Sequence, residues 1–236
     1  MKTIGLIGGM SWESTSLYYQ LINRAVSARL GGLHSAQVLM YSVDFHEIEE
    51  LQRTDRWQEA GARLAEIAQT LERGGADFIV LCTNTMHIVA EAITAAVRIP
   101  LLHIADPTAD AIIKVGLQSV GLLGTRFTME GGFYRERLEQ RGLRVYTPNA
   151  ADRDIIHRVI YDELCLGKVN DASRQQYRRI IESLRDAGAE SMIFGCTEIG
   201  MLVGPADASV PTFDTTEIHA LAAAAQATSD RTPHRA

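Results

Sequence analysis

Hydrophobic residues follow two patterns along the chain: short apolar runs, and longer stretches in which apolar positions recur every three or four residues. The runs predict buried strands and the longer stretches predict amphipathic helices. The predicted strands are Thr3–Ile7, Gln37–Ser42, Phe78–Leu81, Leu101–Ile104, Ser119–Leu123, Arg144–Tyr146, Ser191–Phe194 and Thr212–Phe213. The predicted helices are Glu13–Leu30, Gln58–Gly74, Asn84–Val97, Pro107–Val115, Gly131–Gly142, Asp152–Cys165, Ser173–Ala187 and a last one from about Thr216. Their alternation favours parallel sheets of the doubly wound α/β type.

The same order of landmarks occurs twice in the chain. GLIGG at 5–9 corresponds to GLLGT at 121–125, GAD at 75–77 to GAE at 188–190, and IPLLHIADPT at 99–108 to VPTFDTTEIH at 210–219. Three landmarks at matching spacing indicate an internal duplication of one α/β unit. We expect two pseudo-symmetric lobes, residues 1–103 plus 214–236 and residues 104–213, with the active-site cleft between them. The last helix should pack back on the first lobe.

Composition narrows the class of partner. With 23 Lys and Arg against 29 Asp and Glu, the formal net charge is −6, which argues against nucleic acid or an anionic membrane surface. The start, MKTIGLIGG, resembles a first strand rather than a signal peptide, and no apolar run approaches membrane-spanning length. Three cysteines without a CxxC pair form neither a disulfide framework nor a zinc site. We therefore expect a cytoplasmic protein with reduced thiols.

Two cysteines follow corresponding predicted strands, Cys82 in LCTNT and Cys196 in FGCTE. Ligands of open α/β sheets bind beyond the carboxyl ends of strands, and a helix N-terminus lowers the pKa of a nearby thiol. Two such thiols on opposite sides of one molecule suit removal of a proton from one face of a carbon and delivery to the other, as in a racemase or epimerase. A lone cysteine is more often a small buried hydrophobe, which is our interpretation of Cys165.

Short polar side chains surround both cysteines and are candidates for binding a substrate carboxylate. Hydroxyl, amide and backbone donors at a helix start bind anions, although plain N-capping explains the same residue types. The glycine turn at 8–11 should let backbone approach the ligand. The candidates are Met10, Ser11, Thr83, Asn84, Thr85, Thr125 and Thr197.

Other motifs are weaker. The first turn is GxxGG rather than the dinucleotide-binding GxGxxG, and no phosphate-binding GxxxxGK[ST] loop occurs. His87 is better explained as a core or solvated residue than as a metal ligand, so we expect no metal site. His103 and His219 follow the two linker strands and are candidates for lining the cleft. Glu198 and Asp106 either tune the thiols or serve as caps or surface residues.

Three segments carry a resemblance to a known family: KTIGLIGGMSWEST at the start, LCTNT and FGCTE. With these motifs the chain resembles the pyridoxal-phosphate-independent aspartate/glutamate racemase family over nearly its whole length. The resemblance implies an isomerase of amino acids that needs no cofactor and no metal and is commonly a homodimer. It also implies that Cys82 and Cys196 act alternately as base and acid, and that Asn84 and Thr85 hold the α-carboxylate of the substrate.

Departures from the family patterns bear on the substrate. Glutamate-specific members carry Asp-Ser-Gly and Cys-Thr-His where this chain has GGM at 8–10 and CTE at 196–198. Archaeal-type aspartate racemases place an arginine near Glu47–Ile48 and a lysine at Cys165, and neither place is basic here. Side chains within a few residues that are candidates for the same role are Gln52, Arg53 and Lys168. The pattern favours a broad-specificity amino-acid racemase.

Alternatives remain at this stage. Within the same fold, the chain fits an aspartate-specific racemase or a hydantoin racemase, whereas a decarboxylase-like relative needs only one cysteine. A two-lobe small-molecule binding module also fits the duplication, but it has no need of paired thiols.

Overall fold

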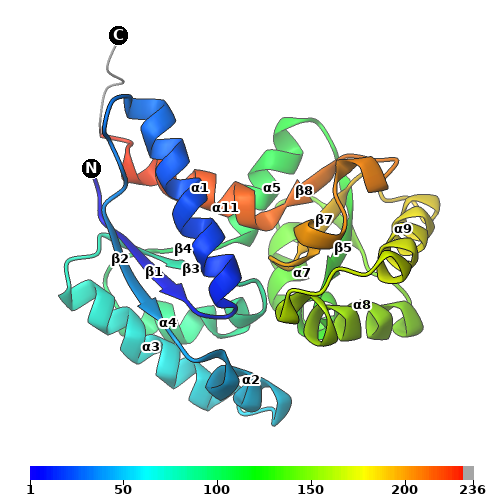
Figure 1. Ribbon diagram of the computed structural model, residues 1–236, viewed down its shortest axis with the longest axis horizontal. Helices are drawn as coiled ribbons and strands as arrows, with labels where there is room; N and C mark the ends of the chain where they lie inside the picture. The colour runs from blue at the N-terminus through cyan, green and yellow to red at the C-terminus, as the bar shows by residue number, and fades with distance from the viewer. Residues whose placement is uncertain (231–236) are drawn as a thin grey trace. The chain divides into compact units, whose positions relative to one another are not determined.

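The computed structural model describes residues 1–230 and contains two parallel sheets of four strands each (Figure 1). The first sheet has the order β2-β1-β3-β4 and the second the order β6-β5-β7-β8. The strands are β1 (Ile4–Gly8), β2 (Val38–Ser42), β3 (Phe78–Leu81), β4 (Leu101–Leu102), β5 (Ser119–Gly124), β6 (Arg144–Tyr146), β7 (Met192–Gly195) and β8 (Thr212–Asp214). The predicted doubly wound α/β fold with parallel sheets is confirmed.

The chain divides into two compact units. The first comprises Met1–His103 and the segment from His219, and the second comprises Ile104–Ile218. Residues 231–236, which the predicted first lobe includes, lie outside the described residues. The α-helices are α1 (Trp12–Leu30), α2 (Phe45–Arg53), α3 (Trp57–Arg73), α4 (Ala90–Ala96), α5 (Ala105–Lys114), α6 (Arg126–Glu130), α7 (Gly132–Glu139), α8 (Ala150–Asp162), α9 (Asp171–Asp186), α10 (Ile199–Leu202) and α11 (Thr215–Ala227). The 3₁₀ helices are η1 (Thr85–Val89), η2 (Leu164–Leu166) and η3 (Pro205–Asp207).

Helices cover both faces of the first sheet, because its central strands are apolar at every position. Ile4 and Leu6 point to one face, where α1 and α11 pack, and Ile7 points to the other, where α3 and α4 pack (Figure 1). α11 packs through four alanines, Ala220, Ala223, Ala224 and Ala227, which keep its buried face narrow. The return of the last helix to the first lobe was predicted from the sequence.

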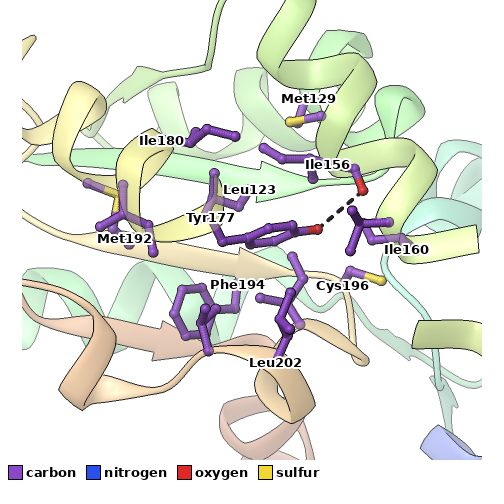
Figure 2. Packing of buried hydrophobic residues seen from close by; sticks show 14 of the residues in the cluster. Leu123, Met129, Ile156, Ile160, Tyr177, Ile180, Met192, Phe194, Cys196 and Leu202 are labelled. Atoms are coloured by element: carbon purple, nitrogen blue, oxygen red, sulfur yellow. Dashed lines mark hydrogen bonds between the residues drawn. The ribbon is translucent and has the colours of Figure 1, made fainter. Parts of the chain in front are cut away.

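The second sheet repeats this arrangement. Its one face packs on α5 and α7, and its other face on α8 and α9. Figure 2 shows the second of these cores, in which the Tyr177 hydroxyl donates to the carbonyl oxygen of Ile156 at 3.2 Å. Cys196 belongs to the same cluster as Tyr177, Ile160 and Leu202.

The acidic residues of the duplicated GAD and GAE segments have matching roles. Asp77 accepts a hydrogen bond on Oδ2 from the backbone N–H of Thr3 at 2.6 Å. Glu190 accepts on Oε2 from the backbone N–H groups of Gln118 and Ser119 at 2.9 and 3.0 Å. Each carboxylate therefore holds the start of the first strand of its own sheet. The duplication thus extends to individual hydrogen bonds.

Two predicted helices differ in the structure. The segment expected as a helix over Asn84–Val97 begins as the 3₁₀ helix η1 and continues as α4, since 3₁₀ turns are common at the N-terminal end of α-helices. The segment expected as a helix over Asp152–Cys165 breaks at Glu163, where φ is −123° and ψ is −68°, and continues as η2. Among the described residues, no helix is long and apolar enough to cross a bilayer.

Candidate active site

Cys82 lies at the carboxyl end of the first sheet. It follows β3, and its backbone N–H donates to the carbonyl oxygen of Ile7 on β1 at 2.9 Å. Its side chain is fully buried on the face that carries Phe78 and Val80, against α1 and α11. Strand alternation explains this placement, because Cys82 is two residues after Val80. The first predicted thiol is thus held rigidly at a strand end.

The loop after Cys82 is anchored by a histidine. Nδ1 of His87 lies 2.8 Å from the carbonyl oxygen of Thr83, which can only accept, so Nδ1 carries the proton. His87 is buried, with its ring centroid 4.4 Å from that of His103 and 6.0 Å from that of His219. Burial, followed by the charges of His103 and His219, lowers the pKa of His87 well below its ordinary value.

His219 is itself fixed by two hydrogen bonds. Its Nε2 lies 2.9 Å from the carbonyl oxygen of Leu102 and must donate, so Nδ1 accepts from the Tyr18 hydroxyl at 2.9 Å. Of the two explanations given for His87, a core or a solvated residue, its burial supports the core residue. His103 and His219 are buried beside it within the first unit. The described residues hold no group of three His, Cys, Asp or Glu side chains arranged to bind a metal.

A buried glutamine contacts the loop after Cys82 from a segment in which the sequence predicted no helix or strand. Gln52 lies on α2, is buried, and donates from Nε2 to Sδ of Met86 at 3.0 Å. Met10 and Met86 belong to one core cluster. The structure therefore brings Gln52 into contact with Met86 of the loop after Cys82, and Met10 lies in the same core cluster as Met86. Thr83, Asn84 and Thr85 are all buried there.

The glycine turn after β1 is tightly packed. Gly9 has φ +94°, and its N–H donates to Thr15 Oγ1 at 2.8 Å. A Cβ at Gly9 would overlap the carbonyl oxygen of Val43. Ser11 is the N-cap of α1, and its hydroxyl accepts from the N–H of Ser14 at 3.3 Å. The capping role foreseen as an alternative for these hydroxyls thus applies to Ser11.

Cys196 lies at the carboxyl end of the second sheet, after β7, and has a carboxylate beside it. Its Sγ donates to Oε2 of Glu198 at 3.0 Å, and the Thr197 hydroxyl donates to the same oxygen at 2.6 Å. All three residues are buried. Of the two roles considered for Glu198, contact with a thiol is the one observed. Asp106, by contrast, pairs with Arg137 at 2.7 Å near the surface.

The remaining predicted residues of this unit lie at different depths. Thr125 is buried and caps α6, accepting from the N–H of Thr128 at 3.3 Å. Lys168 is exposed in the turn after η2, and η2 contacts α10. Cys165, on η2, is half-buried and packs against the cluster that contains Cys196.

The expected lowering of both thiol pKa values by helix N-termini was wrong for this structure. Burial raises the pKa of Cys82. Burial, and then the negative charge of Glu198, raises the pKa of Cys196 well above its ordinary value. The elements that follow are a 3₁₀ turn and the four-residue α10, and such short elements carry small dipoles. Desolvation therefore decides the direction.

The described residues thus form two parallel α/β units, each with a Cys-Thr pair after its third strand. The chain belongs to the Asp/Glu/hydantoin racemase family, which it matches over residues 7–223. It is accordingly a racemase, that is, an isomerase.

Individual relatives agree with this family. A candidate Asp/Glu racemase from Yersinia pestis is 58% identical, with a TM-score of 0.90 over 96% of this chain and 99% of that chain. An aspartate racemase homologue from Pyrococcus horikoshii OT3 is 34% identical, with a TM-score of 0.82 over 97% and 100% of the two chains. The broad specificity amino-acid racemase RacX of Bacillus subtilis is 23% identical over 223 residues, covering 89% of this chain and 92% of RacX.

Proposed function

We propose that the protein interconverts L- and D-amino acids without pyridoxal phosphate, using Cys82 and Cys196 as its two acid/base groups. The observation that carries this proposal is the placement of one buried thiol after β3 and another after β7, each followed by a threonine. A hydrolase or a binding module has no use for two thiols at corresponding strand ends. The family membership supports the same chemistry.

In the proposed reaction one thiol acts on each face of the α-carbon of a bound amino acid. One cysteine, as thiolate, removes the α-proton, and the other, as thiol, delivers a proton to the opposite face. The raised pKa values of both thiols suit this scheme, because a weakly acidic thiol gives a strongly basic thiolate.

The α-carboxylate would be held by the loop after Cys82. Its Thr83, Asn84 and Thr85 are buried and offer hydroxyl, amide and backbone donors. In the second unit, Thr125 and Thr197 are placed at the corresponding strand ends. Because the Thr197 hydroxyl hydrogen points to Glu198, we assign substrate binding at this residue to its backbone N–H or its hydroxyl lone pairs.

We favour broad specificity over aspartate alone. Gln52 reaches the Cys82 loop as a neutral donor, and Lys168 lies on the exposed turn near α10, so no buried cation among these candidates selects a second carboxylate. A neutral amide accepts polar side chains of several kinds. The likeness to RacX supports this choice. The likeness to an aspartate racemase homologue keeps aspartate as the second candidate.

Independence from pyridoxal phosphate is supported by the lysines. The sequence contains three, Lys2, Lys114 and Lys168, and each is exposed or half-exposed. A Schiff-base lysine is desolvated in its pocket.

We further propose that the protein is a cytoplasmic homodimer. Light scattering of the purified protein tests the dimer.

The substrate panel is the direct test of this function. Purified protein is incubated with individual L-amino acids and with a single enantiomer of a 5-substituted hydantoin. The circular dichroism signal of each substrate is followed with and without added pyridoxal phosphate. We expect the circular dichroism signal to decay for several amino acids, aspartate included, at rates that the cofactor does not change. Conversion of aspartate alone would reject broad specificity, conversion of the hydantoin alone would reject amino-acid racemisation, and binding without conversion would reject the enzyme.

A further inference from the structure

The two proposed thiols differ in what lies next to them. Oε2 of Glu198 receives both the Cys196 thiol, at 3.0 Å, and the Thr197 hydroxyl, at 2.6 Å. The Cys196 sulfur and the Thr197 hydroxyl thus converge on one carboxyl oxygen, which is the acceptor placed at the sulfur.

Glu198 is buried, with 5% of its surface exposed. Burying a carboxylate is costly unless hydrogen bonds compensate it. The threonine bond fixes the oxygen at the sulfur, so the carboxylate is positioned rather than mobile. A glutamate placed for solubility or for capping would be exposed or would bind a backbone N–H instead.

We propose that Glu198 is the proton partner of Cys196: it accepts the thiol proton so that Cys196 can act as a base. This inference rests on the two-cysteine function proposed above. Glu198 acts through Cys196, which makes it a positioning residue rather than a residue that contacts substrate.

The step conserves charge. Transfer breaks the Sγ–H bond and forms an Oε2–H bond, and the negative charge moves from oxygen to sulfur. The thiolate then takes the α-proton, so a C–H bond breaks, an Sγ–H bond forms and the electron pair stays on the α-carbon. The Cys82 thiol donates its proton to the opposite face and becomes the thiolate. Moving a proton within the pair avoids expelling it from a buried site, where a new net charge is expensive.

In the described part of the chain, Cys82 has no carboxylate in the position that Glu198 takes beside Cys196. Burial alone accounts for its raised pKa, and the residue two positions later, corresponding to Glu198, is Asn84. An amide cannot accept a proton at neutral pH. The two units are thus chemically unequal, and the proposed proton acceptor, Glu198, belongs to the second unit.

Other titratable groups surround the pair. Cys165 lies on η2, and its charge also raises the pKa of Cys196. Tyr177, on α9, is bound to the Ile156 carbonyl and has a raised pKa through burial. Asp214, on β8, lies against Gly200 of α10, and burial raises its pKa. Among the hydrogen bonds of the described residues, the one to the Cys196 sulfur comes from the contact with Glu198 and not from Cys165, Tyr177 or Asp214.

The test compares Glu198→Gln, Glu198→Asp and a matched control, Glu190→Gln, whose carboxylate serves the start of β5. We expect Glu198→Gln to lose about a hundredfold in kcat/KM near neutral pH, a typical general-base effect, and to recover as rising pH ionises the thiol directly. Glu198→Asp should restore at least about a tenth of the wild-type rate. Glu190→Gln should keep the wild-type pH profile. Thermal unfolding by circular dichroism verifies that each variant is folded.

A second readout separates this proposal from the proposed function. Alkylation of Cys196 by iodoacetamide is followed by mass spectrometry in protein lacking Cys82 and Cys165. Removing the carboxylate charge should speed alkylation in Glu198→Gln although racemisation slows, because only catalysis needs the proton acceptor. An unchanged pH profile of racemisation, or equal losses in the Gln and Asp variants at every pH, would overturn the role of Glu198. If wild type converts no substrate, the two-cysteine function fails, and unchanged alkylation in Glu198→Gln would then also reject the coupling.

Discussion

Cys82 and Cys196 occupy different positions in their sheets, although each follows the third strand of its unit. Cys82 is level with the glycine that ends β1, because Ile7 pairs with Leu81 one residue earlier. Cys196 comes one residue beyond the pair that Gly124 forms with Gly195.

A shift of one residue changes the face of the sheet. Cys82 consequently packs on the side of α1, the helix after the first strand, whereas Cys196 packs on the side of α8 and α9, the helices after the second strand. The expectation of two equivalent thiols is corrected to two thiols with unequal surroundings.

The glycine turn gives a prediction about stability. Gly9→Ala should destabilise the protein by about 2–4 kcal/mol, because the new Cβ overlaps the Val43 carbonyl and φ is +94°. Gly75 is the matched control, since its φ is +96° but its Cβ position is open. Gly75→Ala should cost only about 1–2 kcal/mol of backbone strain. Urea unfolding of both variants measures the difference, and equal losses would show that packing against Val43 is unimportant.

The buried His87 predicts a loss of stability in mild acid. Its pKa is lowered in the folded protein, so below about pH 6.5, the ordinary histidine value, the unfolded chain binds a proton that folded His87 does not. The contribution of neutral His87 to the free energy of unfolding is therefore complete above that pH. It falls as the pH is lowered towards the pKa of His87 in the folded protein. The free energy of unfolding should decrease by up to about 1.4 kcal/mol per pH unit for this group.

The variant His87→Gln keeps a donor for the Thr83 carbonyl and removes the titration. Its unfolding free energy should depend less steeply on pH than that of wild type, measured by urea unfolding across mild acid. His157 also has a pKa lowered by burial, so His157→Gln serves as a comparison in the second unit. Identical slopes in wild type and His87→Gln would contradict the assignment.

Gln52 gives a prediction about specificity. Gln52→Leu keeps the side-chain size and removes the donor, so KM should rise about tenfold for substrates with polar side chains, the effect of one lost hydrogen bond. Alanine should be converted within about twofold of the wild-type rate. Gln69→Leu is the control, because Gln69 is half-buried in the same unit and donates to the Ala96 carbonyl. The same change in KM for every substrate would exclude a role in side-chain selection.

Local patterns sufficed for much of the fold. Phe78–Leu81 and Arg144–Tyr146 were predicted to the residue, because each is an apolar or β-prone run bounded by turn residues. α2 was not predicted, since its buried side chains are only Ile48 and the polar Gln52. Apolar periodicity cannot reveal a helix that buries a glutamine.

The chemistry of the site depended on tertiary structure. The direction of the thiol pKa shifts follows from burial among distant residues, which no local motif carries. The Glu198 contact needed a particular rotamer of a residue only two positions from Cys196. The one-residue shift between Cys82 and Cys196 became visible only in strand registers, although the spacing of the landmarks indicated the duplication correctly.

The central claim, that two thiols share one α-carbon, is tested most directly by single-cysteine variants in D₂O. Inversion of an L-amino acid is followed by circular dichroism, and exchange of its α-proton by nuclear magnetic resonance, for Cys82→Ser, Cys196→Ser and the control Cys165→Ser. We predict that the first two variants each lose at least about a thousandfold in racemisation, that one of them still exchanges the α-proton without inversion, and that the control matches wild type. Racemisation at the wild-type rate by both Cys82→Ser and Cys196→Ser would contradict the account.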